Sequence, residues 1–305
     1  MACDSRQVYQ GLDIGTGKLP GGVLGSKYQV LRVKKQQECW EIDGVKIWMY
    51  DVINPRQQYT VFDYINKVRQ VIGQIEDRGK LPIIVGGTGL YLRGLLDGFD
   101  NLQIPFDPKL RGELSKLSLK ELQKKLSTLS PIKWKNLNNS DQNNPRRLVR
   151  QIEFLSIKTN VGKNTMAFVN LPANHNVLKI GLTAPRSYLN QKIDQRVLEW
   201  VKDGIVDEVK SLLKMGVPAK RFKEIGLEYA LVSDYIIGQI SDLEQLIQLM
   251  QTKVRQYAKR QMTWFKKEKN VNWFDVTDQS WQTKVEKDVL AWYNQRDNEQ
   301  HKSQD

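Results

Sequence analysis

The chain has 305 residues, 40% of them hydrophobic and 27% charged, which is enough to bury a core as one large domain or two smaller ones. No apolar run approaches the roughly 20 residues that cross a bilayer, and the first residues lack a signal-peptide pattern, so we expect no membrane association. Two cysteines, Cys3 and Cys39, are too few for a disulfide framework or a structural zinc site, and we expect a cytoplasmic location.

The net charge of +13 is concentrated in two stretches. Residues 109–163 contain 13 Lys and Arg against 4 Asp and Glu, and residues 251–270 contain 7 against 1. Localised positive charge of this size is typical of proteins that follow a phosphate backbone. Lysine-rich helices that only keep a surface soluble would look the same. Charge alone leaves these two interpretations equally open.

Two short runs early in the chain are predicted to be buried strands. Residues 46–53 (KIWMYDVI) and 81–85 (LPIIV) are rich in branched and aromatic side chains. Between them Thr60 and Asp63 resemble a capping box, and apolar residues then recur at helical spacing. Strand, helix and strand in this order predict a crossover unit and a parallel sheet.

A basic helical insertion is predicted over 106–165. Ser118 caps one helix, and Pro145 begins another in which Arg146 and Arg150 lie one turn apart on the same face. The insertion is expected to interrupt an α/β domain.

The chain is expected to return to the α/β core after the insertion. Residues 177–184 (VLKIGLTA) predict a strand, Pro185 opens a helix, and Ser241 starts a long one. The tail from Asn294 is polar and predicted to be disordered. We therefore expect four parts: the N-terminal part of the catalytic core (1–105), the basic insertion (106–165), the return to the core with the C-terminal helices (166–293) and a disordered tail (294–305).

The first motif that indicates chemistry is D-S-R-Q-V-Y-Q-G-L-D-I-G-T at residues 4–16. It follows the stub of a strand and places Asp4 at the carboxyl end, where open α/β sheets bind ligands. An aspartate there can accept a proton or orient a nucleophile, while Ser5 and Gln7 can contact the edge of a base. The simpler alternative for Asp4 is a capping residue in a surface loop.

The second motif is G-G-T-G-L-Y at residues 86–91, directly after the strand expected at 81–85. Glycines at a strand-to-helix turn leave backbone N–H groups free to approach an anion, and Thr88 can donate a hydrogen bond. The spacing and the lysine of a P-loop are absent. A glycine-rich turn can also exist without any ligand.

The third motif is R-Q-Y-A-K-R-Q-M-T-W-F at residues 255–265. Arg255 and Lys259 lie one helical turn apart with Arg260 beside them, among aromatic side chains. Basic residues between aromatics suit contact with phosphate or nucleic acid. For Trp264 and Phe265 we favour the alternative that they pack in the core.

These three motifs, with D-V-I-N-P-R-Q-Q-Y at 51–59, G-L-T-A-P-R-S-Y-L at 181–189 and R-V-L-E-W-V-K-D-G-I-V-D-E-V at 196–209, resemble the tRNA dimethylallyltransferase family from Asp4 to about Asp275. The resemblance implies an α/β fold with a P-loop-kinase-like parallel sheet, a helical insertion domain and a helical C-terminal part. It also implies transfer of a dimethylallyl group from its diphosphate to N6 of the adenosine 3′ to the anticodon. The expected partners are a tRNA anticodon stem-loop and dimethylallyl diphosphate, bound by a monomeric chain.

The resemblance also implies roles for residues at the matching positions. Asp4 is the expected general base, and Thr88 lies near the reacting groups, so these two are the expected catalytic residues. The expected tRNA-binding residues are Asp4, Ser5, Arg6, Gln7, Arg111, Arg146, Arg147, Leu148, Val149, Arg150, Lys223, Gly226 and Glu228. The expected diphosphate-binding residues are Gly86, Gly87, Arg196, Lys259 and Arg260.

The family's P-loop, which holds the diphosphate and Mg²⁺, should precede Asp4, but only Met1, Ala2 and Cys3 do so. We therefore expect that the sheet lacks its first strand here, that the chain is a fragment or begins at an internal methionine, and that its activity as written is weak. Mg²⁺ is the cofactor that the family implies. The alternatives are a relative that binds tRNA without catalysis and, against the basic insertion, an adenylate isopentenyltransferase.

Overall fold

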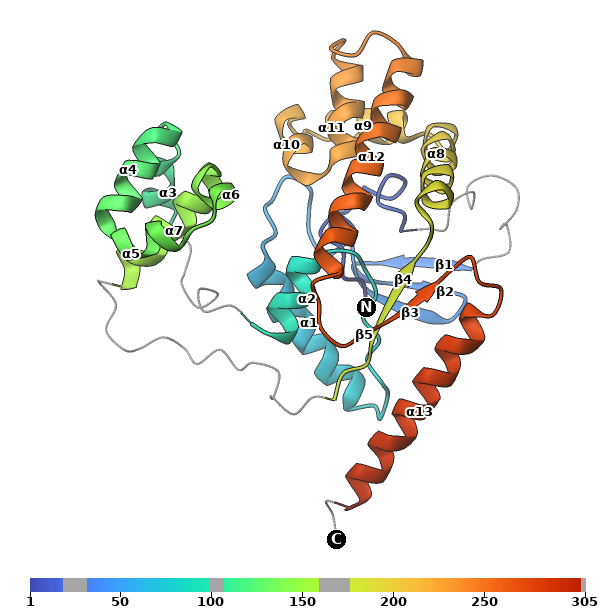
Figure 1. Cartoon of the computed structure of the whole chain (residues 1–305). Coiled ribbons are helices and arrows are strands. Elements are labelled where there is room, and N and C mark those ends of the chain that lie inside the picture. The colour runs from blue at the N-terminus through green and yellow to red at the C-terminus, as the bar shows by residue number, and fades with distance from the viewer. Residues whose placement is uncertain (19–31, 99–106, 159–175, 303–305) are drawn as a thin grey trace. The chain divides into compact units, whose positions relative to one another are not determined.

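The computed structural model describes residues 1–18, 32–98, 107–158 and 176–302. It divides into two compact units: unit 1 contains Met1–Leu95 and Asn174–Asp305, and unit 2 contains Leu96–Ala173 (Figure 1). Unit 2 encloses the range 106–165 that the sequence predicts as an insertion. Each unit is described by itself.

Unit 1 contains an antiparallel sheet in the order β1-β2-β3, formed by β1 (Val33–Gln36), β2 (Glu38–Ile42) and β3 (Val45–Tyr50). The strand predicted at 46–53 is confirmed over Val45–Tyr50. The crossover unit predicted from it is wrong, because β3 pairs antiparallel with β2 and no strand forms at 81–85. Asp43 and Gly44 both have positive φ, 49° and 81°, which makes the two-residue turn that joins β2 to β3. The Asp-Gly pair was a hairpin signal in the sequence, and our interpretation missed it.

The first three residues run beside residues 83–85 in parallel. Cys3 N donates to Val85 O at 2.7 Å and Val85 N donates to Met1 O at 2.9 Å, while Ala2 N bonds Trp48 O at 2.9 Å on the other side. The prediction of a buried strand at 81–85 is wrong, because only a single bridge forms at Val85, whose side chain is 66% exposed. An apolar segment favours burial, but it does not determine whether the segment pairs as a strand.

Helix α1 (Val61–Glu76) follows the predicted capping box, in which the Thr60 side chain accepts from Asp63 N. Its buried face packs Tyr64 against Tyr91 of α2 (Gly89–Leu96), with the two rings stacked 4.1 Å apart. This packing places the glycine-rich turn at 86–88 beside the first residues of the chain.

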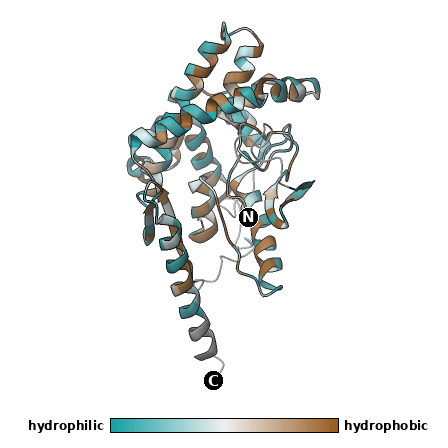
Figure 2. Ribbon diagram, turned by 90° about the vertical axis from the view of Figure 1, so that its right-hand side faces the viewer, coloured by the Kyte–Doolittle hydropathy of each residue, from teal (hydrophilic) through white to brown (hydrophobic). Residues whose placement is uncertain are grey.

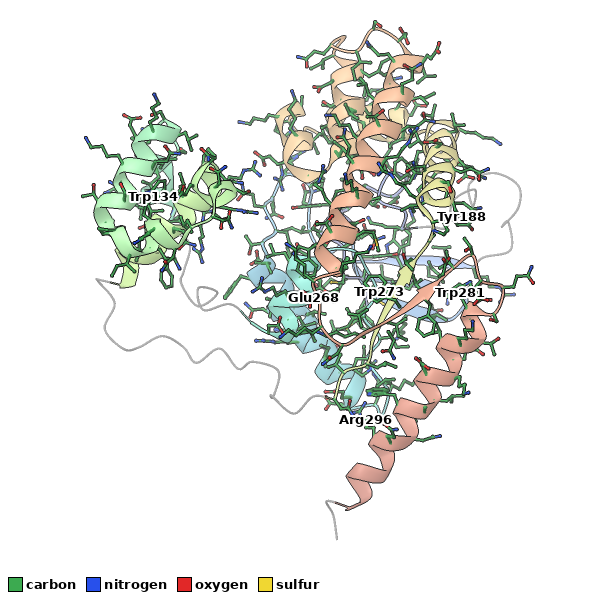
Figure 3. All side chains as sticks on the ribbon, viewed as in Figure 1. Trp134, Tyr188, Glu268, Trp273, Trp281 and Arg296 are labelled. Atoms are coloured by element: carbon green, nitrogen blue, oxygen red, sulfur yellow. The ribbon has the colours of Figure 1, made fainter. Side chains whose placement is uncertain are left out.

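A second sheet pairs β4 (Lys179–Thr183) in parallel with β5 (Val271–Asp275). The strand predicted at 177–184 is confirmed, and β5 was not predicted. Figure 3 labels Glu268, just before β5, whose carboxylate pairs with Lys179 Nζ at 3.7 Å. Pro185 then precedes α8 (Arg186–Lys202), as expected.

The rest of unit 1 is helical. Its elements are α9 (Ile205–Lys214), α10 (Ala219–Ile225), α11 (Leu227–Ile236), α12 (Leu243–Phe265) and α13 (Trp281–Lys302). Figure 2 shows that these helices carry both hydrophobic and hydrophilic stretches. Val8 and Leu12, both 0% exposed, belong to the same core cluster as Phe222, Tyr229 and Met250. The loop that contains the first motif is therefore anchored in the helical core.

The C-terminal tail differs from the expectation. We predicted disorder from Asn294, whereas α13 continues to Lys302. Polar composition alone does not exclude a helix. A polar segment can extend a helix whose earlier turns are already formed, because each added residue gains a backbone hydrogen bond.

Unit 2 is made of α3 (Pro108–Leu114), α4 (Leu119–Leu129), α5 (Pro131–Asn136), α6 (Asn139–Gln142) and α7 (Pro145–Lys158). The helices predicted from Ser118 and Pro145 are confirmed as α4 and α7. A small core of its own joins α3, α4 and α7 through Leu114, Leu122, Leu126, Leu148 and Ile152.

Candidate active site

A cavity of about 420 Å³ opens in unit 1 beside the first motif. Five segments line it: the loop at 4–17, the glycine-rich turn, helix α8, the start of α11 and the facing part of α12. Its lining residues are Asp4, Arg6, Gln7, Asp13, Ile14, Gly15, Thr16, Gly17, Gly87, Leu189, Ile193, Arg196, Trp200, Asp203, Leu227, Glu228, Val254, Tyr257, Ala258 and Gln261. Charged, amide and apolar side chains thus meet in one place from distant parts of the sequence.

Asp4 lies in this cavity wall with its side chain 14% exposed. Its Oδ1 accepts a hydrogen bond from Arg6 N at 2.8 Å, and no described residue donates to Oδ2. One carboxylate oxygen is thereby held in place, and the other is left to accept a proton.

Thr88 is joined to the same segment. Ser5 N donates to Thr88 Oγ1 at 3.0 Å, and Thr88 N donates to Cys3 O at 3.1 Å. The two residues expected to be catalytic, Asp4 and Thr88, therefore lie on two segments that are directly hydrogen-bonded to each other.

The glycine-rich turn has a packing role that the sequence did not show. A Cβ on Gly86 would lie 2.2 Å from Cys3 O, which no side chain can tolerate. Gly86 is absent from the cavity lining, whereas Gly87 is present and its carbonyl accepts from Gln261 Nε2 at 2.8 Å. Of the two glycines expected to bind diphosphate, only Gly87 lines the cavity.

Arg6 is turned inward. Its guanidinium forms an ion pair with Glu228, lies 3.6 Å from Asp4 Oδ1 and sits 5.1 Å from the centre of the Tyr257 ring. Burial disfavours the charge of Arg6, but the Glu228 and Asp4 carboxylates outweigh burial and raise the pKa of Arg6. Glu228 is 1% exposed. The sequence predicted Arg6 and Glu228 as tRNA contacts, and the structure places them as partners of each other.

Gln7 lines the cavity with its amide fixed. Its Nε2 donates to Thr16 O at 3.0 Å. The loop that carries Thr16 closes back on itself, since Thr16 Oγ1 donates to Leu12 O at 2.6 Å and Gly17 N donates to Ile14 O at 3.1 Å. The Gln7 side chain is thus supported by a compact turn.

The residues expected to bind diphosphate do not gather in one place. Arg196 lies in the lining of the main cavity. Lys259 and Arg260 instead line a separate groove of about 260 Å³ on α12, together with Thr263, Trp264 and Lys267. They lie on a different face of α12 from Ala258 and Gln261, because a helix turns 100° per residue.

Two expected contacts lie where α10 meets α11. Lys223 Nζ pairs with Asp234 Oδ1 at 3.2 Å and its side chain is 55% exposed. Gly226 packs against the Arg6 side chain, since a Cβ there would lie 3.1 Å from Arg6 Cδ. Lys223 keeps an exposed cation, whereas Gly226 serves the buried ion pair.

The arginines of unit 2 are largely engaged by acids. Arg111 makes two hydrogen bonds of 2.6 Å to the fully buried Glu153, and Arg150 Nη1 lies 3.3 Å from the same carboxylate. Arg147 pairs with Asp141 on the surface, and Arg146 is exposed. Within this unit a bidentate pair on a buried acid has a structural function.

Leu148 and Val149, which the resemblance predicts as tRNA contacts, have buried side chains, and their contact with tRNA stays a prediction. They are 0% and 9% exposed and belong to the core of unit 2. On α7 the basic residues Arg146, Arg147 and Arg150 turn outward, and the two apolar residues between them turn inward. The resemblance covered the whole segment, and helical periodicity separates its two faces.

Two buried cations escaped the sequence analysis. Lys18 is 2% exposed and its Nζ donates to Tyr9 O at 2.7 Å, to Asp13 Oδ1 at 2.9 Å and to Asp51. Arg221 is 8% exposed and its Nε donates to Pro55 O at 2.9 Å. The acceptor of Arg221 at Pro55 is remote in the sequence, and Lys18 joins two nearby acceptors to the remote Asp51, so the local pattern marks neither cation.

The described residues do not provide a complete magnesium site. Among them no group of three or more His, Cys, Asp and Glu side chains could hold a metal ion. The two lysines Lys18 and Lys35 already engage Asp13.

The cavity with Asp4 in its wall and the basic helical unit can be compared with known proteins. The sequence model of the IPP transferase family matches residues 7–268. The chain belongs to this family. The motif resemblance, the expected enzyme class and the P-loop-kinase-like fold are thereby confirmed.

The alignments with named relatives cover most of both chains. A tRNA dimethylallyltransferase of Halalkalibacterium halodurans is 33% identical over 289 residues, which are 92% of this chain and 84% of that protein. The tRNA dimethylallyltransferase 2 of Treponema denticola is 35% identical over 279 residues, 90% of this chain and 86% of that protein.

Solved structures agree. The tRNA isopentenylpyrophosphate transferase of Bacillus halodurans has a TM-score of 0.64 and 29% identity, over 98% of this chain and 89% of that one. A eukaryotic dimethylallyltransferase acting on tRNA has a TM-score of 0.68 at 22% identity, over 98% of this chain and 72% of that one, which supports the fold alone. Within the described segments of this chain, no helix combines the length and apolarity needed to cross a bilayer.

Proposed function

We propose that this IPP transferase moves a dimethylallyl group from dimethylallyl diphosphate to N6 of the adenosine 3′ to the anticodon of a tRNA. The observation that carries the proposal is the position of Asp4. Its Oδ1 is held by Arg6 N, its Oδ2 has no donor among the described residues, and it lines a cavity that also contains Gln7 and Arg196.

In the proposed reaction Asp4 is the general base. The N6 lone pair forms a bond to C1 of the dimethylallyl group, and the C1–O bond to diphosphate breaks with its electron pair going to the leaving group. The N6 proton passes to Asp4. Thr88 supports this geometry because its hydroxyl accepts from Ser5 N beside the base.

The leaving diphosphate needs positive charge or N–H donors near it. Arg196 and Gly87 line the cavity and are the groups we assign to this task. Gly86 remains a support for the turn, because it is packed on Cys3. Lys259 and Arg260 lie in the separate groove on α12, and we assign them to the tRNA backbone instead.

We assign the remaining tRNA contacts by exposure. Ser5 and Gln7 are placed to contact the flipped base, because a base must leave its stack to be modified. Exposed cations at Arg146, Arg147 and Lys223 are assigned to phosphates. Arg6, Arg111 and Arg150 form ion pairs with carboxylates. We assign them to keeping the neighbouring segments in position for tRNA binding.

The proposal also includes the oligomeric state, the location and the cofactor of the protein. The chain acts as a monomer in the cytoplasm, and Mg²⁺, the cofactor that the family implies, would help to neutralise the charge of the diphosphate. Size-exclusion chromatography with light scattering tests the first part, because a dimer would elute at twice the 35.4 kDa of the chain.

Transfer of radiolabelled dimethylallyl diphosphate to an unmodified anticodon stem-loop tests the reaction. Labelled RNA is the expected product, and a stem-loop with guanosine in place of the target adenosine is the matched control. Salt-sensitive RNA binding without product would favour the non-catalytic relative. Product on free adenosine monophosphate with none on RNA would favour the adenylate isopentenyltransferase.

A further inference from the structure

The cavity loop at 13–16 is held by two side chains of the helical core. Glu208, in the first turns of α9, accepts hydrogen bonds at Oε2 from Asp13 N and Ile14 N, both at 3.0 Å. Two successive backbone N–H groups of the loop thus converge on one carboxylate oxygen. Burial raises the pKa of Glu208, and its bonds to Tyr229 and to the loop oppose that effect.

Tyr229 of α11 completes the arrangement. Its hydroxyl donates to Glu208 Oε1 at 2.7 Å and accepts from Gly15 N at 3.1 Å. All three successive N–H groups from Asp13 to Gly15 are therefore satisfied by this pair. A Cβ on Gly15 would lie 3.0 Å from the Tyr229 ring and 2.9 Å from Ile205 Cδ1, so the loop is pressed onto the helices.

The loop in turn determines which atoms Gln7 can offer. Gln7 Nε2 donates to Thr16 O at 3.0 Å, and the residues on both sides of this bond line the cavity. Gln7 Nε2 also lies 3.5 Å from Gly17 O, so both N–H donors of its NH₂ group have acceptors in the loop and Gln7 is left with its Oε1 acceptor for a bound base. An acceptor suits an exocyclic amine such as N6 of adenine, and it repels the O6 of guanine.

We propose that Glu208 and Tyr229 are positioning residues, which hold the 13–16 loop so that Gln7 presents its Oε1 to the acceptor purine. The proposal deepens the proposed function and rests on it. A purely structural role is the rival explanation, since any loop packed on a core needs partners for its N–H groups.

A double-mutant cycle separates the two explanations. The variants are Tyr229→Phe, which removes a single hydroxyl, and Glu208→Gln, each made alone and together with Gln7→Ala. Both kcat/KM for transfer and Kd for the anticodon stem-loop are measured, with the melting temperature recorded for every variant. Asp207→Asn is the matched control, because Asp207 lies in the same turn of α9 and pairs only with Lys210 on the surface.

Positioning through Gln7 predicts a loss of roughly tenfold in kcat/KM for Tyr229→Phe in the parent chain, and less than about twofold in the Gln7→Ala background. The control should stay at the parent value. Equal losses in both backgrounds, or losses that follow the melting temperature alone, would overturn the proposal. If the parent transfers nothing, the proposed function fails, and the same cycle on Kd still decides whether the pair acts through Gln7.

Discussion

Arg6 and Glu228 lie 222 positions apart in the sequence and form an ion pair that lines the cavity. The guanidinium also lies 3.6 Å from Asp4 Oδ1, so one cation joins the expected base to α11. A residue type that the sequence suggested for RNA contact therefore organises the interior of the site.

This ion pair should contribute to stability through both partners. Removing one partner of a buried pair leaves an uncompensated charge, so Glu228→Gln and Arg6→Met should each lower the free energy of unfolding by about 3 kcal/mol. The double variant Arg6→Met/Glu228→Leu should lose less than the sum of the two. Urea unfolding measures all three, and additive losses would show that the two side chains do not interact.

The role of Asp4 predicts a separation of chemistry from binding. Asp4→Asn keeps an acceptor for Arg6 N but cannot take a proton, so kcat should fall by about 10²–10⁴ while the stem-loop Kd stays within about twofold. Asp77→Asn, at the exposed end of α1, is the matched control. Full activity in Asp4→Asn would show that another group is the base.

Substitution by alanine should have opposite effects on stability at Gly86, in the glycine-rich turn, and at Gly73, in α1. Gly86→Ala would bring Cβ to 2.2 Å from Cys3 O and should destabilise unit 1 or prevent its folding. Gly73→Ala, inside α1 with nothing within 4 Å, should stabilise the chain by about 0.5–1 kcal/mol. Thermal unfolding compares them, and equal melting temperatures would contradict the close approach of Gly86 to Cys3.

The two faces of α7 predict different phenotypes. Arg146→Ala should leave stability unchanged, weaken tRNA binding and lower the slope of log K against log salt by about 1. Leu148→Ala should lower the stability of unit 2 by about 2–5 kcal/mol through the cavity it leaves. Filter binding over a salt series and urea unfolding test the pair. A salt slope unchanged in Arg146→Ala would remove this residue from the RNA contact.

The buried thiol of Cys3 predicts that the stability of the fold depends on pH in the alkaline range. Burial raises the pKa of Cys3 to about 12, and the Tyr64 hydrogen bond opposes that effect. Between the ordinary pKa of 9.0 and this value, the unfolded thiol loses its proton and the folded one keeps it, so stability falls as pH rises above about 9. Cys3→Ser should flatten this fall. Native protein at pH 8 should react slowly with a thiol reagent, and rapid labelling of Cys3 would show that the thiol is accessible.

The sequence by itself determined the family and the order of the local elements. Motif spacing and helical periodicity are properties of the chain, so the capping box at Thr60, the strand at 177–184 and the helix from Pro145 could be predicted. The resemblance predicts Asp4 and Thr88 as catalytic residues, whereas the hydrogen bond from Ser5 N to the Thr88 hydroxyl is seen only in the structure.

Only the tertiary structure decided which side chains are available to a ligand. Local pattern does not state which acid will meet Arg6 or Arg111, nor that Leu148 turns inward between exposed arginines. Lys18, Arg221 and the Glu208–Tyr229 pair escaped notice for the same reason. Asp51 for Lys18, Pro55 for Arg221 and the 13–15 loop for the Glu208–Tyr229 pair lie at remote positions in the sequence. The interaction of a buried charge is set by the atoms that folding brings within about 3 Å of it.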